Sequence, residues 1–273
     1  MIGPMPAALR VIHPAPAAAV VALSAVLGAV LASQAGIPIG EGWALTVLAV
    51  AGSQVFTGAT NDIADRERDA AARPEKPIPA GQLSLNAAAW IASIGLAVQL
   101  AASLRTGGLA LALGAVATGS ALAYNLALSR TPLSPLPYLI SFGLLPAWIA
   151  AGVGVPLERV LPAIPLVAPF AIAAHLANTL RDFEADVAGG SRSLAQVLGR
   201  QASRLLAAGL ALAVGLGVGG ALLLGGRSTP WGIGLGLVGL VAVGQGAFSE
   251  RRLWYGVLLA AVCWTAAWAL STG

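Results

Sequence analysis

Residues 84–104 read SLNAAAWIASIGLAVQLAASL, a run of 21 residues without one charged side chain. In an α-helix each residue rises about 1.5 Å, so this run is about 30 Å long, which is the thickness of the hydrocarbon core of a bilayer. The next run, residues 108–128, has the same length and again carries no charge. Over the 273 residues of the chain, 58% are hydrophobic and 10% are charged, against about 25% charged in soluble domains. The sequence therefore predicts an all-α membrane protein.

Further apolar runs lie on both sides of these two, separated by short segments that contain Pro, Gly and charge. They predict about nine transmembrane helices, near residues 15–33, 43–64, 84–104, 108–128, 133–154, 161–186, 202–224, 231–248 and 253–271. Two of the later helices contain Gly215-x-x-x-Gly219 and Gly232-x-x-x-Gly236. This small-residue spacing is expected to allow the backbones of neighbouring helices to approach closely.

The basic residues predict an orientation. If the N-terminus is cytosolic, 12 of the 15 Lys and Arg residues lie in cytosolic segments, and only Arg105, Arg159 and Arg227 lie outside. Under the positive-inside rule this split places the N-terminus in the cytosol and the C-terminus outside the cell membrane of a bacterium or archaeon. The net charge of +4 is spread between the spans and not gathered in one patch, so membrane lipids and not nucleic acid are the expected partners. The oligomeric state is left open.

One carboxylate pattern occurs twice. Residues 61–69 read NDIADRERD and residues 178–186 read NTLRDFEAD, and both contain Asn-x-x-x-Asp-x-x-x-Asp. On a helix this spacing is expected to place one amide and two carboxylates along one face. The second copy lies four spans after the first, both on the cytosolic side. A single transmembrane domain, residues 1–273, is therefore predicted to hold two four-helix pseudo-repeats, about residues 10–130 and 131–248, plus one helix.

Each pattern concentrates negative charge that needs a cation. Carboxylates one turn apart repel each other, and local ion pairs with Arg66 and Arg68 are one way to offset this. A divalent cation is the other, because Mg²⁺ is commonly held by a few carboxylates together with substrate phosphates. Two acidic helix ends that faced each other would suit a diphosphate bridged by Mg²⁺.

The segment after the first pattern, residues 72–81, reads ARPEKPIPAG and is predicted to be a loop, since its prolines exclude a continuing helix. Arg73 and Lys76 in this loop are expected to neutralise charge that grows on a departing diphosphate. Plain cytosolic anchoring is the alternative interpretation. Arg181 and Arg192, within and after the second pattern, are candidates of the same kind.

These stretches resemble the signature of the UbiA superfamily of intramembrane prenyltransferases. The resemblance is carried by residues 61–69, by Arg73-Pro74-x-Lys76-Pro77-Ile78-Pro79-x-Gly81, and by Asp182-x-x-x-Asp186-x-x-x-Gly190 continuing to Gly199. It spans roughly residues 10–199. It implies an all-helical ring around a central cavity, Mg²⁺ at both Asp-rich patterns, and transfer of an allylic prenyl group from its diphosphate to a lipophilic acceptor, which is an aromatic compound, a quinone precursor or a lipid.

The resemblance also implies roles for single residues. The metal ligands would be Asn61, Asp62, Asp65, Asp69, Asp182 and Asp186. The catalytic residues would be Asp65, Asp182, Arg73, Lys76 and Tyr124, the last of which matches a cavity tyrosine of the family. The substrate-binding residues would be Asn61, Arg10, Asn178, Arg181, Arg130 and Arg192. The family usually has a lysine where this sequence has Ser129, with Arg130 adjacent, and Ser193 and Ala195 replace a Thr and a Pro. His13 is interpreted as an interfacial residue.

Three alternatives stay open. A terpene cyclase would ionise the same diphosphate and differ only in the later fate of the carbocation. A transferase with a sugar-phosphate acceptor would be expected to carry extra basic residues at the cavity mouth. An ion-coupled transporter could also use repeated acidic patterns, but its acids would be expected near the bilayer midplane, whereas these lie at helix ends.

Overall fold

Helices form wherever the sequence offers a long uncharged run. The structure, a computed structural model, describes residues 5–270, and this part of the chain contains helices and turns but no strand. The nine main helices are α2 (Pro14–Gln34), α3 (Glu41–Ala72), α4 (Leu85–Thr106), α5 (Gly108–Ala123), α6 (Pro135–Val153), α7 (Ile164–Thr179), α10 (Arg200–Leu224), α11 (Pro230–Gly244) and α12 (Glu250–Leu270). Three short helices are α1 (Ala7–Arg10), α8 (Phe183–Ala188) and α9 (Leu194–Leu198). The prediction of an all-α membrane fold is confirmed.

The number of membrane spans agrees approximately with the predicted nine. Within residues 5–270, seven helical stretches are long and apolar enough to cross a membrane. Helix α11 is apolar but has only 15 residues. Helix α12 coincides with the last predicted span, whose final residue, 271, lies outside the described part of the chain.

The chain divides into two compact units. The first unit comprises residues 1–127 and 147–157, and the second comprises residues 128–146 and 158–273. The first Asp-rich stretch, on α3, belongs to the first unit, and the second, which follows α7, belongs to the second unit. The predicted internal duplication stays a prediction.

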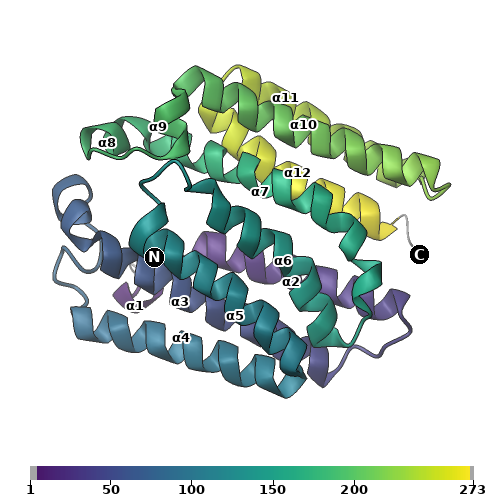
Figure 1. Ribbon diagram of the computed structural model, residues 1–273, viewed down its shortest axis with the longest axis horizontal. Coiled ribbons are helices and arrows are strands. Elements are labelled where there is room, and N and C mark those ends of the chain that lie inside the picture. The colour runs from purple at the N-terminus through teal and green to yellow at the C-terminus, as the bar shows by residue number, and fades with distance from the viewer. Residues whose placement is uncertain (1–4, 271–273) are drawn as a thin grey trace. The chain divides into compact units, whose positions relative to one another are not determined.

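In the first unit α3 and α4 lie side by side because two glycines let their backbones touch (Figure 1). A Cβ atom on Gly52 would lie 2.6 Å from the carbonyl oxygen of Gly95, and one on Gly95 would lie 2.8 Å from that of Gly52. No side chain larger than hydrogen fits at either position without a shift of the helices.

The glycines predicted to bring backbones together in the second unit act differently. A Cβ on Gly215 of α10 would lie 2.2 Å from the Trp264 ring, and one on Gly239 of α11 would lie 2.4 Å from it. The indole Nε1 of Trp264 donates a hydrogen bond to the carbonyl oxygen of Gly236 at 3.2 Å. Gly215, and Gly239, which was not among the predicted glycines, therefore make room for an indole on α12. The expectation of direct backbone approach at Gly219 and Gly236 was wrong, because an added Cβ would meet no atom there within 4 Å.

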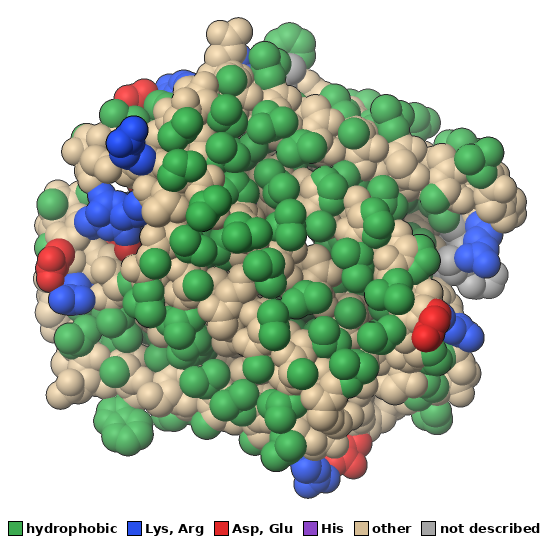
Figure 2. Space-filling view, in the orientation of Figure 1, with side chains coloured by type: hydrophobic (Ala, Val, Ile, Leu, Met, Phe, Trp, Pro, Cys, Tyr) green, Lys and Arg blue, Asp and Glu red, His purple; other side chains and the backbone are tan. Residues whose placement is uncertain are grey.

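Large apolar side chains cover the outside of the helices. On α4, Trp90 is 70% exposed, Ile94 is 59% exposed and Leu104 is 64% exposed. Apolar side chains dominate the face drawn in Figure 2, and charged ones are few. In water such a surface would be an unusually large apolar patch, whereas in a bilayer lipid chains solvate it.

Candidate functional site

The first Asp-rich stretch is helical over its whole length. Helix α3 continues to Ala72, beyond the predicted end at residue 64, because residues 66–72 consist mainly of the helix formers Arg, Glu and Ala. Arg73 caps the helix with φ −144° and ψ 61°, since the following Pro74 disfavours the helical conformation of the residue before it. The amide nitrogen of Arg73 still donates to the carbonyl oxygen of Asp69 at 2.7 Å.

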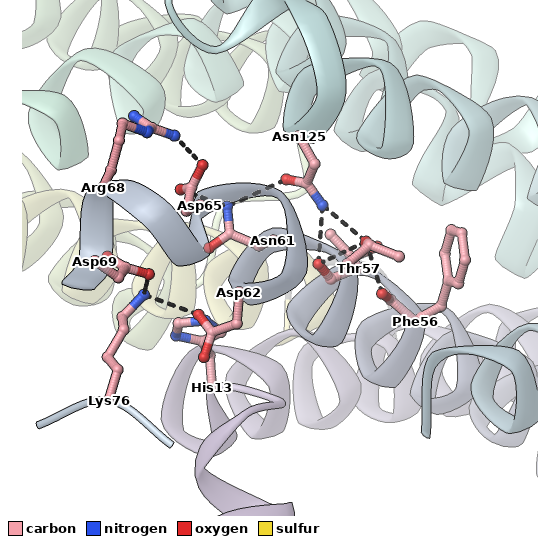
Figure 3. A network of polar contacts seen from close by, with 11 residues as sticks. His13, Phe56, Thr57, Asn61, Asp62, Asp65, Arg68, Asp69, Lys76 and Asn125 are labelled. Atoms are coloured by element: carbon pink, nitrogen blue, oxygen red, sulfur yellow. Dashed lines mark hydrogen bonds and ion pairs between the residues drawn. The ribbon is translucent and has the colours of Figure 1, made fainter. Parts of the chain in front are cut away.

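Asn61 and Asp65 form one pair on α3 (Figure 3). Nδ2 of Asn61 lies 3.5 Å from Oδ2 of Asp65, at the limit of a hydrogen bond. Arg68 forms an ion pair with the other carboxylate oxygen of Asp65. The neighbouring Arg66 pairs with Glu67 at 2.9 Å, on the exposed side. The ion pair considered for Arg68 is therefore present, whereas Arg66 pairs with Glu67 and not with an aspartate of the pattern.

Asp62 and Asp69 form a second pair, directed to a different side of α3 (Figure 3). Nζ of Lys76 lies 2.8 Å from Oδ1 of Asp62 and 2.7 Å from Oδ2 of Asp69. Nε2 of His13 lies 2.9 Å from the same oxygen of Asp62. The carboxylates are nearly buried, at 2% exposed for Asp62 and 8% for Asp69. Lys76 thus forms ion pairs with two carboxylates that water scarcely reaches.

Helical phase explains why the expected single face divides in two. Each residue turns about 100°, so Asp69 is rotated about 80° from Asn61 but only about 20° from Asp62. The expectation that Asn61, Asp65 and Asp69 share one face was therefore wrong for Asp69. Its carboxylate joins that of Asp62 at Lys76.

The N-terminal segment closes over this second pair. The guanidinium of Arg10 donates to the carbonyl oxygen of Glu75 at 2.5 Å and to Oε1 of Gln82 at 2.7 Å, which fastens the loop that carries Lys76. His13 has φ 51° and is the one non-glycine residue with positive φ within residues 5–270. Such a conformation costs about 1–3 kcal/mol and needs support from its surroundings. The contact with Asp62 supplies it, so His13 belongs to this network and is more than an interfacial residue.

Tyr124 opens a π-helical turn, Tyr124–Leu128, which directly follows α5. Single π-turns inside helices occur often at functional sites. Tyr124 is half-buried, and the next residue, Asn125, is only 6% exposed. Nothing in the sequence singled out Asn125, because one Asn in an apolar run carries no pattern.

The second Asp-rich stretch is not one continuous helix. Helix α7 ends at Thr179, a 3-10 turn covers Leu180–Asp182, and α8 begins at Phe183. The expectation that Asn178, Asp182 and Asp186 lie on one continuous α-helix was therefore wrong, and that their side chains share one face stays a prediction.

Neighbouring helices hold the side chains on both sides of this break. Leu180 is fully buried in the core of the second unit. The guanidinium of Arg181 lies 5.3 Å from the centre of the Trp254 ring, and that of Arg200 lies 5.2 Å from the centre of the Phe183 ring. These cation–π contacts, each worth about 0.5–1 kcal/mol at exposed sites, stabilise the turn. Of the predicted residues here, Asn178 is half-buried in the last turn of α7, Asp182 is exposed, and Asp186 is half-buried.

The loop after the second stretch is hydrogen-bonded to the segment that precedes α6. The guanidinium of Arg130 donates to the carbonyl oxygen of Gly189, and the amide nitrogen of Arg192 donates to the carbonyl oxygen of Arg130 at 3.0 Å. The amide nitrogen of Leu194 donates to Oγ of Ser134 at 3.3 Å. The backbone segments that carry Arg130 and Arg192, two of the predicted cations, therefore lie next to each other in space.

Ser134 links this loop to α7. Its Oγ also lies 3.0 Å from Nε2 of His175, and both side chains are fully buried. The Tyr138 ring packs on the imidazole of His175, with the two ring centres 4.7 Å apart. No pattern in the sequence singles out Ser134 or His175, because these two partners lie 41 residues apart along the chain.

The donor atoms suit Mg²⁺ shared with a substrate better than a metal held by protein alone. Over the described residues, no three His, Cys, Asp or Glu side chains lie close enough together to hold a metal ion. The donor atoms are hard oxygens, those of the Asn61 amide and the Asp65 carboxylate in the first unit, and those of the Asp182 and Asp186 carboxylates in the second. Mg²⁺ usually takes one or two carboxylates and completes its coordination with phosphates and water. The residues present fit Mg²⁺ in that manner.

The fold is an all-α membrane fold, and its site combines the pair Asn61 and Asp65 with a proline-rich loop that carries Lys76. These features are those of an intramembrane protein and not of a soluble one. The sequence matches the UbiA prenyltransferase family over residues 21–252, and the chain belongs to this family. The resemblance stated from the sequence is confirmed.

Two relatives carry the name digeranylgeranylglyceryl phosphate synthase. The chain is 32% identical over 187 residues to that of Methanoculleus marisnigri, which covers 67% of this chain and 65% of the relative. It is 30% identical over 208 residues to that of Thermococcus gammatolerans, which covers 70% of this chain and 68% of the relative. The chain thus spans about two thirds of the length of these curated relatives.

Solved structures share the fold. A UbiA homolog from Archaeoglobus fulgidus bound to GPP and Mg²⁺ superposes with a TM-score of 0.70 at 14% sequence identity, covering 98% of this chain and 100% of that one. At this identity the similarity establishes the fold and no more.

Proposed function

We propose that this protein is a Mg²⁺-dependent prenyltransferase, which transfers a prenyl group from an isoprenoid diphosphate to a lipophilic acceptor within the membrane. The observation that carries the proposal is the first Asp-rich stretch of a UbiA-family chain, where Asn61 and Asp65 pair on α3 while Lys76 is held beside them by Asp62 and Asp69. A homolog of the same fold has been solved with GPP and Mg²⁺ bound, and a prenyl diphosphate with Mg²⁺ is the substrate proposed for this chain.

The residues of the two stretches and of the neighbouring segments would have different roles in the reaction. Asn61 and Asp65 would hold Mg²⁺ from the first stretch, and Asp182 and Asp186 from the second. When bound, Mg²⁺ supplies positive charge that stabilises the diphosphate leaving group. Arg73, Lys76 and Arg192 would add charge from the two loops, Arg181 from the turn after α7 and Arg130 from the segment before α6, and this charge would help the allylic C–O bond to break.

The surrounding helices would protect the carbocation that remains. Water would convert this cation to an alcohol, so a chamber of apolar helices that excludes water is needed until the acceptor attacks. Tyr124, half-buried at the π-turn, is proposed to face the reacting end of the prenyl chain, as the family resemblance implies. Asp62 and Asp69 are better regarded as holding Lys76 in place than as metal ligands.

The orientation proposed from the sequence has both Asp-rich stretches at the cytosolic side, the N-terminus in the cytosol and the C-terminus outside. This orientation is supported by the distribution of the basic residues, of which 12 lie in segments expected in the cytosol and three in segments expected outside. In the first unit, Arg105 and Glu41 pair at 2.7 Å at the end of α3 that lies away from Asn61 and Asp65. This agrees with Arg105 as an outside residue.

The acceptor is proposed to be a lipid, and a phosphate-bearing lipid is the first to test. The two relatives are named for a glyceryl phosphate product. The backbone of Arg192, which follows the second stretch, is hydrogen-bonded to that of Arg130, which precedes α6, and these two basic residues would suit a second anionic group. Aromatic and quinone-precursor acceptors are the alternatives, and a sugar phosphate is a further one.

The proposal is tested by incubating the purified protein in lipid nanodiscs with Mg²⁺, labelled prenyl diphosphates of several lengths and a panel of acceptors. Diphosphate release and a prenylated product are expected, with at least about 100-fold slower turnover for Asp65→Ala and for Asp182→Ala. Glu67→Gln, at an exposed position of α3, is the matched control and should retain activity.

Other products would point elsewhere. A cyclic hydrocarbon formed without an acceptor would indicate a terpene cyclase. Cation-coupled uptake into vesicles, with no diphosphate release from any substrate, would indicate a transporter and overturn the proposal.

A further inference from the structure

Asn125 is a buried amide in contact with the first Asp-rich stretch, and no motif contains it. Its Nδ2 lies 2.9 Å from the carbonyl oxygen of Thr57 and 2.9 Å from Oγ1 of Thr60, and its Oδ1 lies 3.3 Å from Nδ2 of Asn61 (Figure 3). We propose that Asn125 is a positioning residue that fixes the Asn61 amide with its oxygen, and not its NH₂ group, turned toward Mg²⁺. The inference rests on the proposed function in one step only, the presence of the cation.

Backbone carbonyls determine which way the Asn125 amide points. The carbonyl oxygen of Thr57 can only accept a hydrogen bond. The hydroxyl of Thr60 directs its single hydrogen to the carbonyl oxygen of Phe56 at 2.8 Å or to that of Thr57 at 3.1 Å, so toward Asn125 it acts as an acceptor. A reversed Asn125 amide would set its oxygen against two acceptors and lose both hydrogen bonds. The NH₂ group of Asn125 therefore faces α3 at Thr57 and Thr60.

The orientation of the Asn125 amide in turn determines the orientation of the Asn61 amide. The oxygen of Asn125 faces the Asn61 amide and needs a donor, and Oδ2 of Asp65 on the other side of Asn61 also accepts. Both neighbours thus select the NH₂ group of Asn61. Its Oδ1 is left as the outward atom and receives no hydrogen bond from any donor within residues 5–270.

The direction of this amide matters because only one end can bind a hard cation. An amide oxygen is a ligand for Mg²⁺, whereas an NH₂ group carries partial positive charge and would repel it. Groups behind a metal ligand that fix its orientation are typically worth 10–100-fold in metal affinity. The burial of Asn125, at 6% exposed, keeps water from replacing it as the partner of Asn61.

The test measures metal binding without turnover. Binding of Mn²⁺ with inorganic pyrophosphate is followed by electron paramagnetic resonance in the protein with Asn125→Leu, which keeps the branched arrangement of heavy atoms but has no amide. We expect Mn²⁺ affinity to fall by about 10–100-fold. In an Asn61→Ala background, Asn125→Leu should cause no further loss, because its effect passes through Asn61.

A second pair of variants covers the case in which Asn125→Leu fails to fold. Thr60→Val removes one acceptor of Asn125 and should weaken Mn²⁺ binding, whereas Thr60→Ser keeps the hydroxyl and should bind as the natural chain does. Thr118→Val removes a different buried hydroxyl of the same unit, hydrogen-bonded to Ser53 at 2.9 Å, and is the matched control. Its Mn²⁺ affinity should be unchanged.

The outcomes separate the inference from the proposed function. If the folded Asn125→Leu protein binds Mn²⁺ as the natural chain does, or weakens it equally in the Asn61→Ala background, the positioning role is overturned. The proposed function survives that result as long as Asp65→Ala still loses Mn²⁺. If Asp65→Ala binds Mn²⁺ unchanged, or the natural chain binds none, the metal site itself fails and the inference with it.

Discussion

At the residue scale, Lys76 is the cation on which the buried carboxylates of α3 depend most. Its ammonium lies within 2.8 Å of two carboxylates, those of Asp62 and Asp69, that are almost buried. Removing one partner of a buried pair typically costs about 3–5 kcal/mol, because the other partner keeps its charge without compensation. Asp62 would retain His13, so the penalty falls mainly on Asp69.

We therefore expect Lys76→Met to lower the free energy of unfolding by about 3 kcal/mol, measured by titration with denaturing detergent in mixed micelles. Adding Asp69→Asn should recover a large part of the loss. Arg66→Met, which breaks an exposed pair with Glu67, is the control and should change stability by less than about 1 kcal/mol. Equal effects of Lys76→Met and Arg66→Met would show that Lys76 is not a structural counter-ion.

The sequence revealed the charged residues of the site but not their partners. Acids and cations stand out in a chain with 10% charge, and their repeated spacing directs attention to Asp65 and Asp182. Which acid meets which cation depends on helical phase and on how the loop folds back, and these separate Asp69 from Asn61. Asn125 was missed because its role depends on α3, more than 60 residues earlier in the chain.

At the element scale, the ends of most helices could be predicted, because an apolar run stops where Pro, Gly or a charge begins. Helices α2, α4 and α10 end within two residues of their expected ends. The break after α7 could not be predicted, since Arg181 meets Trp254 of α12 and Phe183 meets Arg200 of α10. Contacts between segments distant in sequence override local helix preference there.

The contact between α3 and α4 yields a prediction for Gly52. In Gly52→Ala the new Cβ would lie 2.6 Å from the carbonyl oxygen of Gly95, so the helices must separate. We expect a loss of about 1–3 kcal/mol in the free energy of unfolding, as for other overpacked contacts. Gly119→Ala, where no atom lies within 4 Å, is the control and should gain up to about 1 kcal/mol from helix propensity. A neutral Gly52→Ala would contradict the close packing of the two backbones.

The link between Ser134 and the loop after α8 yields another. Ser134→Ala removes the acceptor of the Leu194 amide and the partner of His175 Nε2. The loss of about 1 kcal/mol from one hydrogen bond should speed amide exchange in residues 189–194 about five-fold, as measured by mass spectrometry. Ser53→Ala removes a buried hydroxyl in the first unit and should leave this loop unchanged. Unaltered exchange in Ser134→Ala would show that the loop does not depend on Ser134.

At the scale of the whole molecule, the exposed apolar side chains and the uneven distribution of basic residues require the bilayer to act as solvent and to impose an orientation. The positive-inside rule predicts the side for each connection. It thereby predicts that both Asp-rich stretches open to the same side of the membrane, which is a requirement for one diphosphate to meet both.

The single cysteine makes this orientation directly measurable. Cys263 is buried, so Cys263→Ala gives a thiol-free background. Into it we would introduce, one at a time, Glu75→Cys after the first stretch, Gln201→Cys after the second and Arg227→Cys in a connection expected outside, all at exposed positions. A membrane-impermeant maleimide should label only Arg227→Cys in intact bacterial cells and only the other two in inside-out vesicles. Labelling of Glu75→Cys and Gln201→Cys from opposite sides would place the two Asp-rich stretches on opposite faces of the bilayer, and no single diphosphate could then be bound by both.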